Sequence, residues 1–542
     1  MRVSTSILQL FKEYPVGGVI LFRENLSGSI EEILQLTDSL QENSQFGRFI
    51  GIDQEGGIIN RIRVATRMPG NMALGAINNL ELTTQAASII ASELNALGIN
   101  LNFAPCVDVN SNPQNPVIGV RSFGQNPQLV ARHGCAYIDG LNQQQVIACA
   151  KHFPGHGNTN NDSHLGEVIV NSTFDYLEQY DLIPFQAAIA HGVDMVMAAH
   201  IVAPHLDDGR IYSAKSNCEV RIPATFSKKI ITGLLRQKLG FSGVIVSDAL
   251  DMQAITKNFD PVEATILSLQ AGIDLVVMPF QIRNSDDIKK FIDYFNQVYA
   301  ICESSPQLIE HIQQACSRII KLKQLKITSP KNFLSVKSRT LFKQRTDEVK
   351  QIVGSSKHRQ FERDIAKQAI TLYKNSTKTL PWLSNRQDQI LVISTNSSIA
   401  DSSKTILNDL HYTNVNTMVL DIADEKDEKS FMHNLWYQIQ VADKVLLMTY
   451  NLIAPNEMLN NIINQLNGLN KLYVIFSCCN PYDIQYVCGV STNVLVFGAS
   501  GFDKTNNLFK KFTLNLTQAI TLAFSAVSEN QFNHYVPINL DL

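Results

Sequence analysis

Short apolar runs alternate with longer amphipathic stretches through the first half of the chain. The apolar runs are rich in β-branched residues, as buried parallel strands are, and the stretches between them have the period of helices. Seven runs qualify as strands: Gly18–Phe22, Phe49–Asp53, Asn100–Ala104, Ile147–His152, Asp194–Ala198, Gly243–Asp248 and Asp274–Met278. This rhythm predicts an α/β domain built as a (β/α)8-type TIM barrel.

Two of the predicted helices have a clear end. The amphipathic stretch Asn79–Leu97 is followed by Gly98, and Thr225–Leu239 is followed by Gly240. Glycine often ends a helix because it adopts the left-handed backbone conformation without strain. Upstream, only one short helix-like stretch, Ser6–Tyr14, precedes the first strand run.

The second half of the chain has its own α/β pattern. Residues 326–360 are polar and lack a strong period, which predicts a linker. Beyond them, apolar runs return at Gln389–Ser394, Asn416–Leu420, Lys444–Met448, Leu472–Phe476 and Val494–Phe497. We expect a barrel domain over residues 1–325, a linker over 326–360, and a smaller doubly wound α/β domain over 361–542.

Composition narrows the possible partners. A chain of 542 residues suits two domains, and a formal net charge of -3 gives no general attraction to nucleic acid or anionic membranes. The sequence contains no secretory signal and no uninterrupted apolar span of the roughly 20 residues needed to cross a bilayer. The nine cysteines lie mostly in apolar runs, where thiols behave as small hydrophobic groups. The sequence therefore predicts a cytoplasmic protein that binds neither nucleic acid nor membrane.

The densest group of reactive side chains follows the fourth predicted strand. The segment Lys151–Gly157 reads Lys-His-Phe-Pro-Gly-His-Gly, and four residues later Asp162-Ser163-His164 follows. Barrel enzymes place their chemistry at the C-terminal ends of the strands, where Lys151 and His152 lie. The Pro-Gly turn can bring Asp162 and His164 back over the same pocket. One loop is thus expected to hold both a ligand clamp and an acid/base group.

Two other predicted strands also end in charged residues. Asp248 follows the apolar run Val244–Ser247. A buried charge at such a position must either be paired with a partner or take part in function. Asp53 begins Asp-Gln-Glu-Gly-Gly, and Arg61 follows shortly after. An aspartate beside an arginine suits bidentate hydrogen bonding to vicinal hydroxyls.

Together these segments resemble the bacterial branch of glycoside hydrolase family 3 that removes β-linked N-acetylglucosamine. That branch carries K-H-F-P-G-H-G, four residues, then D-S/T-H, and this chain matches the pattern from Lys151 to His164 without a gap. Further agreement lies in Pro116–Gly124, Ile222–Ser227 and Leu239–Met252, whereas the second domain resembles the C-terminal domain of the family more loosely.

The start of the chain departs from the family pattern. In the family a strand and a helix normally precede the segment that matches Gly17–Asn25, so the resemblance implies that the first barrel strand is missing here. An incomplete start site, a true truncation or a barrel closed in another way would each account for this. A lost upstream segment could have carried an export signal.

The resemblance implies a role for each matched residue. Asp248 corresponds to the nucleophile, His164 to the acid/base and Asp162 to the carboxylate that orients it. The positions that hold the sugar ring correspond to Asp53, Arg61, Arg121, Lys151 and His152. The implied activity is the retaining removal of terminal N-acetylglucosamine from peptidoglycan-derived muropeptides, with no metal and no cofactor.

Several alternatives remain open from the sequence. The histidine-rich loop could be a zinc site built from His152, His156, His164 and Asp162. Asp248 could cap a helix, and Asp53 could form a purely structural ion pair with Arg61. At the level of function, phosphorolysis competes with hydrolysis because a histidine acid/base tolerates an incoming phosphate dianion. An incomplete barrel could also belong to a non-catalytic sugar-binding protein.

Overall fold

The computed structural model divides the chain into two compact units. It describes residues 3–14, 16–42, 44–159, 167–327, 339–382, 385–420, 428–498, 514–525 and 528–540. The first unit, called the barrel unit, comprises Met1–Glu55, Asn60–Thr66 and Leu80–His358. The second, the C-terminal unit, comprises Gly56–Ile59, Arg67–Asn79 and Arg359–Leu542. Two short segments from the first hundred residues thus belong with the C-terminal unit.

The barrel unit contains a seven-stranded parallel sheet in the order β1-β2-β3-β4-β6-β10-β11. Its strands are Gly18–Ile20 (β1), Phe49–Ile52 (β2), Leu101–Asn102 (β3), Ile147–Phe153 (β4), Met195–Ala198 (β6), Val244–Ala249 (β10) and Leu275–Val277 (β11). Each of the seven predicted strands is confirmed.

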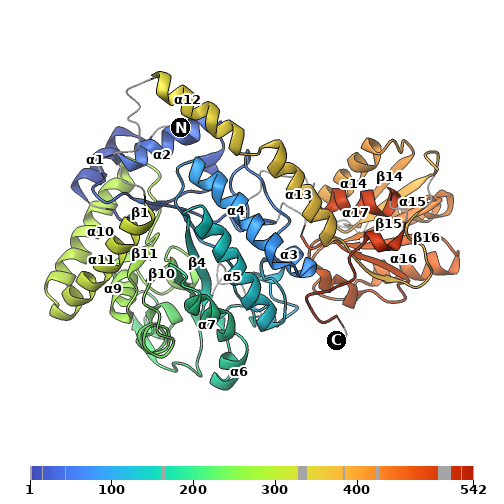
Figure 1. The fold of residues 1–542 in the computed structure, drawn as a ribbon. Helices are drawn as coiled ribbons and strands as arrows, with labels where there is room; N and C mark the ends of the chain where they lie inside the picture. Colours follow the sequence, from blue (N-terminus) through green and yellow to red (C-terminus); the bar gives the residue numbers. More distant parts are fainter. Residues whose placement is uncertain are drawn as a thin grey trace. The chain divides into compact units, whose positions relative to one another are not determined.

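Helices connect successive strands of this sheet. They are Ile30–Gln41 (α2), Leu80–Ala96 (α4), Pro127–Gln143 (α5), Leu182–Ala190 (α7), Lys229–Lys238 (η4) and Pro261–Ala271 (α9), and after β11 come Ser285–Glu303 (α10) and Pro306–Lys326 (α11). Helices α4 and α5 lie side by side in Figure 1. α4 confirms the helix predicted over Asn79–Leu97, and the predicted helix before β1 is present as Thr5–Glu13 (α1).

The helix predicted over Thr225–Leu239 is instead divided. A short turn, Ala224–Phe226, precedes η4, and Ser227 lies between them. The Ser227 hydroxyl accepts a hydrogen bond from the backbone N–H of Ile230 at 3.1 Å and donates one to Asp207 at 2.6 Å. A serine that binds the backbone in this way starts a helix rather than continuing one.

The apolar faces of the seven strands form one core. Phe49, Leu101, Ile147, Met195 and Val244 are among its members, each at most 1% exposed. A Cβ atom on Gly17, next to β1, would lie 3.6 Å from Cδ1 of Leu275 in β11, so the two edge strands of the sheet approach each other. The sheet is therefore curled like a barrel, with seven described strands instead of eight.

The C-terminal unit contains a six-stranded sheet in the order β12-β17-β16-β15-β13-β14. Its strands are Thr371–Asn375 (β12), Ile390–Ser394 (β13), Val415–Val419 (β14), Lys444–Thr449 (β15), Leu472–Ser477 (β16) and Thr492–Leu495 (β17). The last five are parallel and match the predicted runs, whereas β12 is an antiparallel edge strand that was not predicted.

Helices cover both faces of this second sheet. Ser397–Asp409 (α14) and Leu514–Ser525 (α17) contribute to the core on one face, and Glu428–Val441 (α15) and Glu457–Gly468 (α16) to the core on the other. Alternate residues of β13 point into the two cores, as strands covered on both sides require. This arrangement confirms the doubly wound pattern.

The segment expected as a linker, residues 326–360, differs from that expectation. Much of it forms a helix, Arg339–Ile352 (α12), which packs on α2 and α4 within the barrel unit. Arg345 of α12 donates to the Asp38 carboxylate at 2.7 Å. A second helix, Ser356–Ala369 (α13), follows at once. The helix α12 is mainly polar, and its partners α2 and α4 lie more than 240 positions earlier in the sequence. The local pattern of apolar residues therefore gives only a weak sign of this helix.

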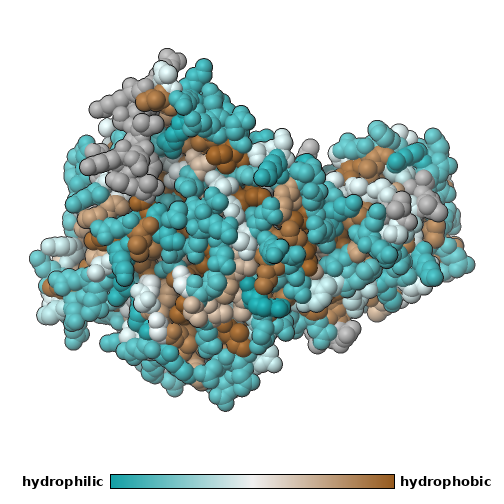
Figure 2. All heavy atoms as spheres, in the orientation of Figure 1, coloured by the Kyte–Doolittle hydropathy of each residue, from teal (hydrophilic) through white to brown (hydrophobic). Residues whose placement is uncertain are grey.

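The surface agrees with the composition. Figure 2 shows mainly hydrophilic side chains, with smaller hydrophobic areas between them. Of the helices that the structure describes, none has the length and apolarity needed to cross a bilayer. All nine cysteines are free thiols.

Candidate active site

Four of the predicted site residues lie at or directly after the C-terminal ends of the barrel strands. Asp53 directly follows β2, Lys151 and His152 lie in β4, and Asp248 lies in β10. The strand register brings the ends of β4 and β10 to one level, because Phe153 and Ser247 both pair with Ala198 of β6. Asp162 and His164 lie outside the described residues.

Lys151 joins two carboxylates at this edge. Its Nζ atom lies 2.8 Å from Oδ1 of Asp53 and 2.7 Å from Oε1 of Glu55. The Lys151 side chain is only 2% exposed, while that of Asp53 is 19% exposed. Arg61 approaches the other oxygen of Asp53 at 3.7 Å. Three of the predicted ring-binding residues, Asp53, Arg61 and Lys151, are therefore close together, with Asp53 the most accessible.

Glu55 connects this group to Arg121. The guanidinium of Arg121 binds the carboxylate through two atoms, Nε at 3.0 Å and Nη2 at 2.8 Å. Burial alone would raise the pKa of Glu55, but Arg121 and Lys151 hold it well below its usual range. Glu55 was not predicted as a site residue, although a glutamate two positions after Asp53, at a buried strand end, was a usable signal.

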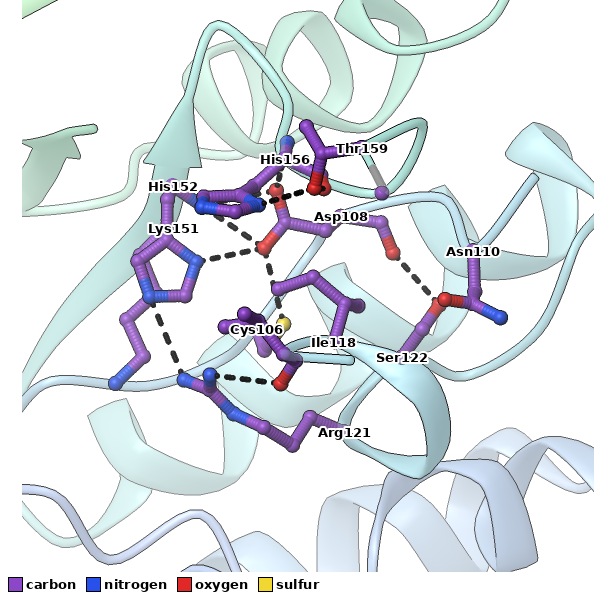
Figure 3. A network of polar contacts seen from close by, with 12 residues as sticks. Cys106, Asp108, Asn110, Ile118, Arg121, Ser122, Lys151, His152, His156 and Thr159 are labelled. Atoms are coloured by element: carbon purple, nitrogen blue, oxygen red, sulfur yellow. Dashed lines mark hydrogen bonds and ion pairs between the residues drawn. The ribbon is translucent and has the colours of Figure 1, made fainter. Parts of the chain in front are cut away.

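Asp108 organises the loop that begins at Lys151 (Figure 3). Its carboxylate accepts hydrogen bonds from the backbone N–H of His152 at 3.2 Å and from that of His156 at 2.7 Å, and it lies 2.7 Å from Nδ1 of His152. Burial alone would raise the pKa of Asp108, but His152 and His156 hold it well below its usual range. Asp108 was not among the predicted site residues, because its partners His152 and His156 lie 44 and 48 positions later in the sequence.

These contacts fix the orientation of His152. Nδ1 faces the Asp108 carboxylate, and Nε2 lies 3.4 Å from Nη2 of Arg121 (Figure 3). A carboxylate only accepts and a guanidinium only donates, so the proton of the neutral imidazole belongs on Nδ1 and Nε2 accepts. Arg121 and His152, both predicted to bind the ring, are thus adjacent.

His156 and Gly157 shape the same loop. His156 is buried, and burial together with His152 lowers its pKa to about 4, so it is neutral at physiological pH. Its Nδ1 lies 3.0 Å from the hydroxyl of Thr159. A Cβ atom on Gly157 would lie 1.8 Å from the carbonyl oxygen of Val109, so only glycine allows the loop to pass this close to the segment that follows β3.

Cys106, Asp108 and His152 form a group with the residue types of a metal site. Their ligand atoms lie within 4.8 Å of one another and all three residues are buried. However, the Cys106 thiol donates to Asp108 at 3.2 Å, and burial and Asp108 raise the pKa of that thiol well above its usual value. Metal binding needs a thiolate and free lone pairs. These contacts fit a hydrogen-bond network better than a metal site, and the group differs from the zinc set considered from the sequence.

Asp248 does not cap the helix that follows it. Its Oδ1 atom accepts from the backbone N–H of the adjacent Ala249 at 2.7 Å, and the next helix, Gln253–Thr256 (α8), begins after Met252. His200 supports this stretch, because its Nε2 atom donates to the carbonyl oxygen of Ala249 at 3.0 Å. The capping alternative for Asp248 is therefore wrong, and a buried strand delivers its carboxylate to the barrel edge.

Comparison with known proteins identifies related sequences. The glycosyl hydrolase family 3 N-terminal domain matches residues 1–322. Beta-hexosaminidase A of Pseudoalteromonas piscicida is 42% identical over 390 residues, which are 70% of this chain and 62% of that protein. The chain therefore spans less than two thirds of the length of this relative.

Solved structures share the architecture. A family 3 β-N-acetylglucosaminidase from a Paenibacillus species has a TM-score of 0.78 and 29% identity, covering 99% of this chain and 96% of that one. NagZ from Neisseria gonorrhoeae has a TM-score of 0.51 and 30% identity, covering 65% of this chain and 95% of that one. The Paenibacillus match extends over both units, so their combination recurs outside this chain.

Proposed function

Because the chain belongs to glycosyl hydrolase family 3, we propose that it is a retaining β-N-acetylglucosaminidase that removes terminal β-linked N-acetylglucosamine from peptidoglycan-derived muropeptides. The observation that carries the proposal is the cluster of Asp53, Lys151 and Arg121, joined through Glu55, at the same barrel edge as Asp248. A paired set of charged donors and acceptors at the same barrel edge as a strand-end carboxylate suits a sugar ring whose anomeric carbon faces that carboxylate.

Asp53 is the best-placed acceptor for ring hydroxyls. Lys151 and Arg61 orient its carboxylate, and its partial exposure leaves room for a ligand. His152 and Arg121 would supply a second group of contacts, since Asp108 and Glu55 hold them in place. Hydrogen bonds from charged groups in a water-poor pocket discriminate strongly between sugars that can and cannot complete them.

The proposed reaction has two steps. In the first, a carboxylate oxygen of Asp248 forms a bond to the anomeric carbon as the bond to the leaving oxygen breaks, and His164 gives that oxygen a proton. In the second, His164 takes a proton from water, whose oxygen attacks the anomeric carbon and releases Asp248. Asp162 is assigned the role of orienting His164. The histidine is recovered in its protonated form, so the cycle is complete.

The muropeptide assignment is the finer part of the proposal. Muropeptides carry a lactyl group and a peptide with carboxylates, and Asp53, Glu55 and Asp108 are each paired with cationic or histidine partners that limit repulsion of such an anion. A histidine acid/base likewise adds no negative charge beside the leaving group. The nine free thiols agree with a reducing compartment, and we place the reaction in the cytoplasm.

The decisive experiment is a turnover assay with a chromogenic β-N-acetylglucosaminide, with and without inorganic phosphate. Hydrolysis predicts free N-acetylglucosamine at a rate that phosphate does not change. Formation of a sugar 1-phosphate would replace the hydrolase by a phosphorylase, and no turnover under either condition would favour a sugar-binding protein.

Replacing the proposed nucleophile, Asp248, tests its role directly. Asp248→Ala should abolish formation of the glycosyl-enzyme while N-acetylglucosamine still binds, because Asp248 acts on the anomeric carbon and not on ring hydroxyls. Single-turnover kinetics and a binding titration would measure both effects. Residual turnover above roughly a hundredth of the wild-type rate would contradict the assignment, since loss of a nucleophile normally costs more.

A further inference from the structure

The loop after β2 carries the two carboxylates that bind Lys151. Directly after Glu55, the backbone of Gly56 and Gly57 turns with positive φ angles of 94° and 60°. The N–H of Gly57 donates to the carbonyl oxygen of Met68 at 3.1 Å, and a Cβ atom on Gly57 would lie 2.8 Å from Cα of Gly70. This part of the loop is therefore pressed against residues 67–70, with no space for a side chain.

Residues 67–70 are in turn held by α13. Oε1 of Glu362 accepts from the backbone N–H of Arg67 at 2.6 Å and from that of Met68 at 3.3 Å. Met68 has a φ of 59°, an unfavourable conformation for a residue with a side chain, and such a conformation persists only where its surroundings enforce it. Glu362 is 5% exposed, so water competes poorly for these bonds.

A second side chain holds the same residues. Nδ2 of Asn515, in α17, donates to the carbonyl oxygen of Pro69 at 3.1 Å. Asn533 likewise donates to the carbonyl oxygen of Ala76 at 2.7 Å, farther along the same segment. All of these contacts lie within the C-terminal unit, which includes Gly56–Ile59 and Arg67–Asn79. Side chains from residues beyond 360 thus fix the backbone that directly follows Glu55.

We propose that Glu362 is a positioning residue for the sugar-binding carboxylates Asp53 and Glu55. The inference rests on the proposed function. Glu55 must reach Lys151 at 2.7 Å and Arg121 at 2.8 Å at the same time, and it is joined covalently to Gly56. A displacement of about 1 Å in that backbone would break this geometry, and misplacements of this size can cost up to about a hundredfold in rate.

The test compares three variants on the full-length chain. Glu362→Ala removes the acceptor, Glu362→Gln keeps an oxygen that can accept from both N–H groups, and Asp364→Ala changes an exposed carboxylate of the same helix. With the chromogenic glycoside we expect Glu362→Ala to raise KM about tenfold with a smaller change in kcat, because ring contacts are weakened. Glu362→Gln and Asp364→Ala should keep the wild-type KM. A general loss of folded enzyme would instead lower the apparent kcat and leave KM unchanged.

Hydrogen exchange gives a readout that does not need turnover. Amides of residues 54–61 should exchange faster in Glu362→Ala than in wild type, with little change elsewhere in the barrel unit. If Glu362→Ala does not fold, Glu362→Asp, which withdraws the acceptor by one methylene, should show the same pattern more weakly. Wild-type KM and wild-type exchange in a folded variant would overturn the proposal. If the wild type does not hydrolyse the glycoside, the proposed function fails while the exchange result still decides the positioning role.

Discussion

At the scale of single residues, the pairing of buried charge distinguishes the proposed sugar-binding cluster from its surroundings. Asp53, Glu55 and Asp108 each accept from a cation or from several N–H groups. Asp181 differs, because it is 1% exposed and neither carboxylate oxygen has a hydrogen-bond partner among the described residues. Burial and the nearby Asp108 raise its pKa to about 7. Asp181 lies directly beneath the histidine loop, since a Cβ atom on Gly155 would lie 2.7 Å from its Cβ.

This carboxyl should make stability depend on pH. The pKa of Asp181 is higher in the folded state than the usual value near 3.9 of an unfolded chain. Its contribution to the free energy of unfolding is therefore complete below pH 3.9 and is lost as the pH rises toward 7. Asp181→Asn removes the titration. Between pH 5 and pH 8, we expect the wild type to lose roughly 3 kcal/mol of unfolding free energy relative to Asp181→Asn.

Thermal and urea unfolding at both pH values would measure this shift. Asp208→Asn is the control, because Asp208 is an exposed aspartate of the same unit. Parallel pH profiles for wild type and Asp181→Asn would contradict the prediction.

The role assigned to His164 leads to a second residue-scale prediction. A group that protonates the leaving oxygen matters less when the leaving group is already good, so His164→Ala should lose far more glycosylation rate on a disaccharide than on an activated aryl glycoside. Deglycosylation should slow equally for both substrates, since the same group then activates water. Asp162→Ala should show a milder form of this pattern. Equal glycosylation losses on both substrates in single-turnover experiments would indicate a binding or structural role for His164.

At the scale of elements, local patterns predicted the strands well. Each of the twelve predicted runs is a strand because burial on both faces leaves a continuous apolar signal. The residues that were missed depend on distant partners. Asp108 became recognisable as a site residue only when His156 was placed beside it. The sequence could have marked Glu55 as a strand-end carboxylate, but its bond to Arg121 depends on the fold. The break before η4 likewise depends on the contact between Ser227 and Asp207. Periodicity carries no information about such pairs.

The turn after the histidine motif gives an element-scale prediction. Gly157→Ala would place a methyl group 1.8 Å from the carbonyl oxygen of Val109, so the histidine loop or the segment around Val109 must move. We expect a loss of about 1–3 kcal/mol in unfolding free energy, as in other overpacked sites, together with a marked fall in kcat. Gly233→Ala is the control, because the nearest atom to its Cβ would be 3.8 Å away. Wild-type activity and stability in Gly157→Ala would show that the loop adapts freely.

At the scale of the whole molecule, the two units are not two consecutive stretches of the sequence. The expected boundaries at residues 325 and 361 place everything before them in one domain, yet Arg67–Asn79 belongs with the C-terminal unit. That segment contains Met68, Met72 and Leu74, each at most 2% exposed. Its assignment depends on contacts such as that between Arg67 and Glu362, across almost 300 residues of sequence. A domain boundary predicted from composition cannot show that an early segment belongs to the later unit.

The last prediction concerns a chain that ends at His358. This shortened chain retains all seven strands of the barrel sheet and every proposed site residue. The domain boundaries expected from the sequence would therefore predict that it is active. The structure predicts otherwise, because Arg67–Asn79 would lose its hydrogen bonds to Glu362, Asn515 and Asn533 together with the rest of its unit. The segment also buries Met68, Met72 and Leu74, and exposing a side chain of this size costs about 1.5–3 kcal/mol. We expect the shortened chain to aggregate or to unfold at a lower temperature, and its folded fraction to bind N-acetylglucosamine weakly because Asp53 and Glu55 are no longer fixed. Co-production of residues 359–542 as a separate chain should restore binding. A monomeric shortened chain with wild-type kcat/KM would show that the C-terminal unit supports neither the fold nor the site.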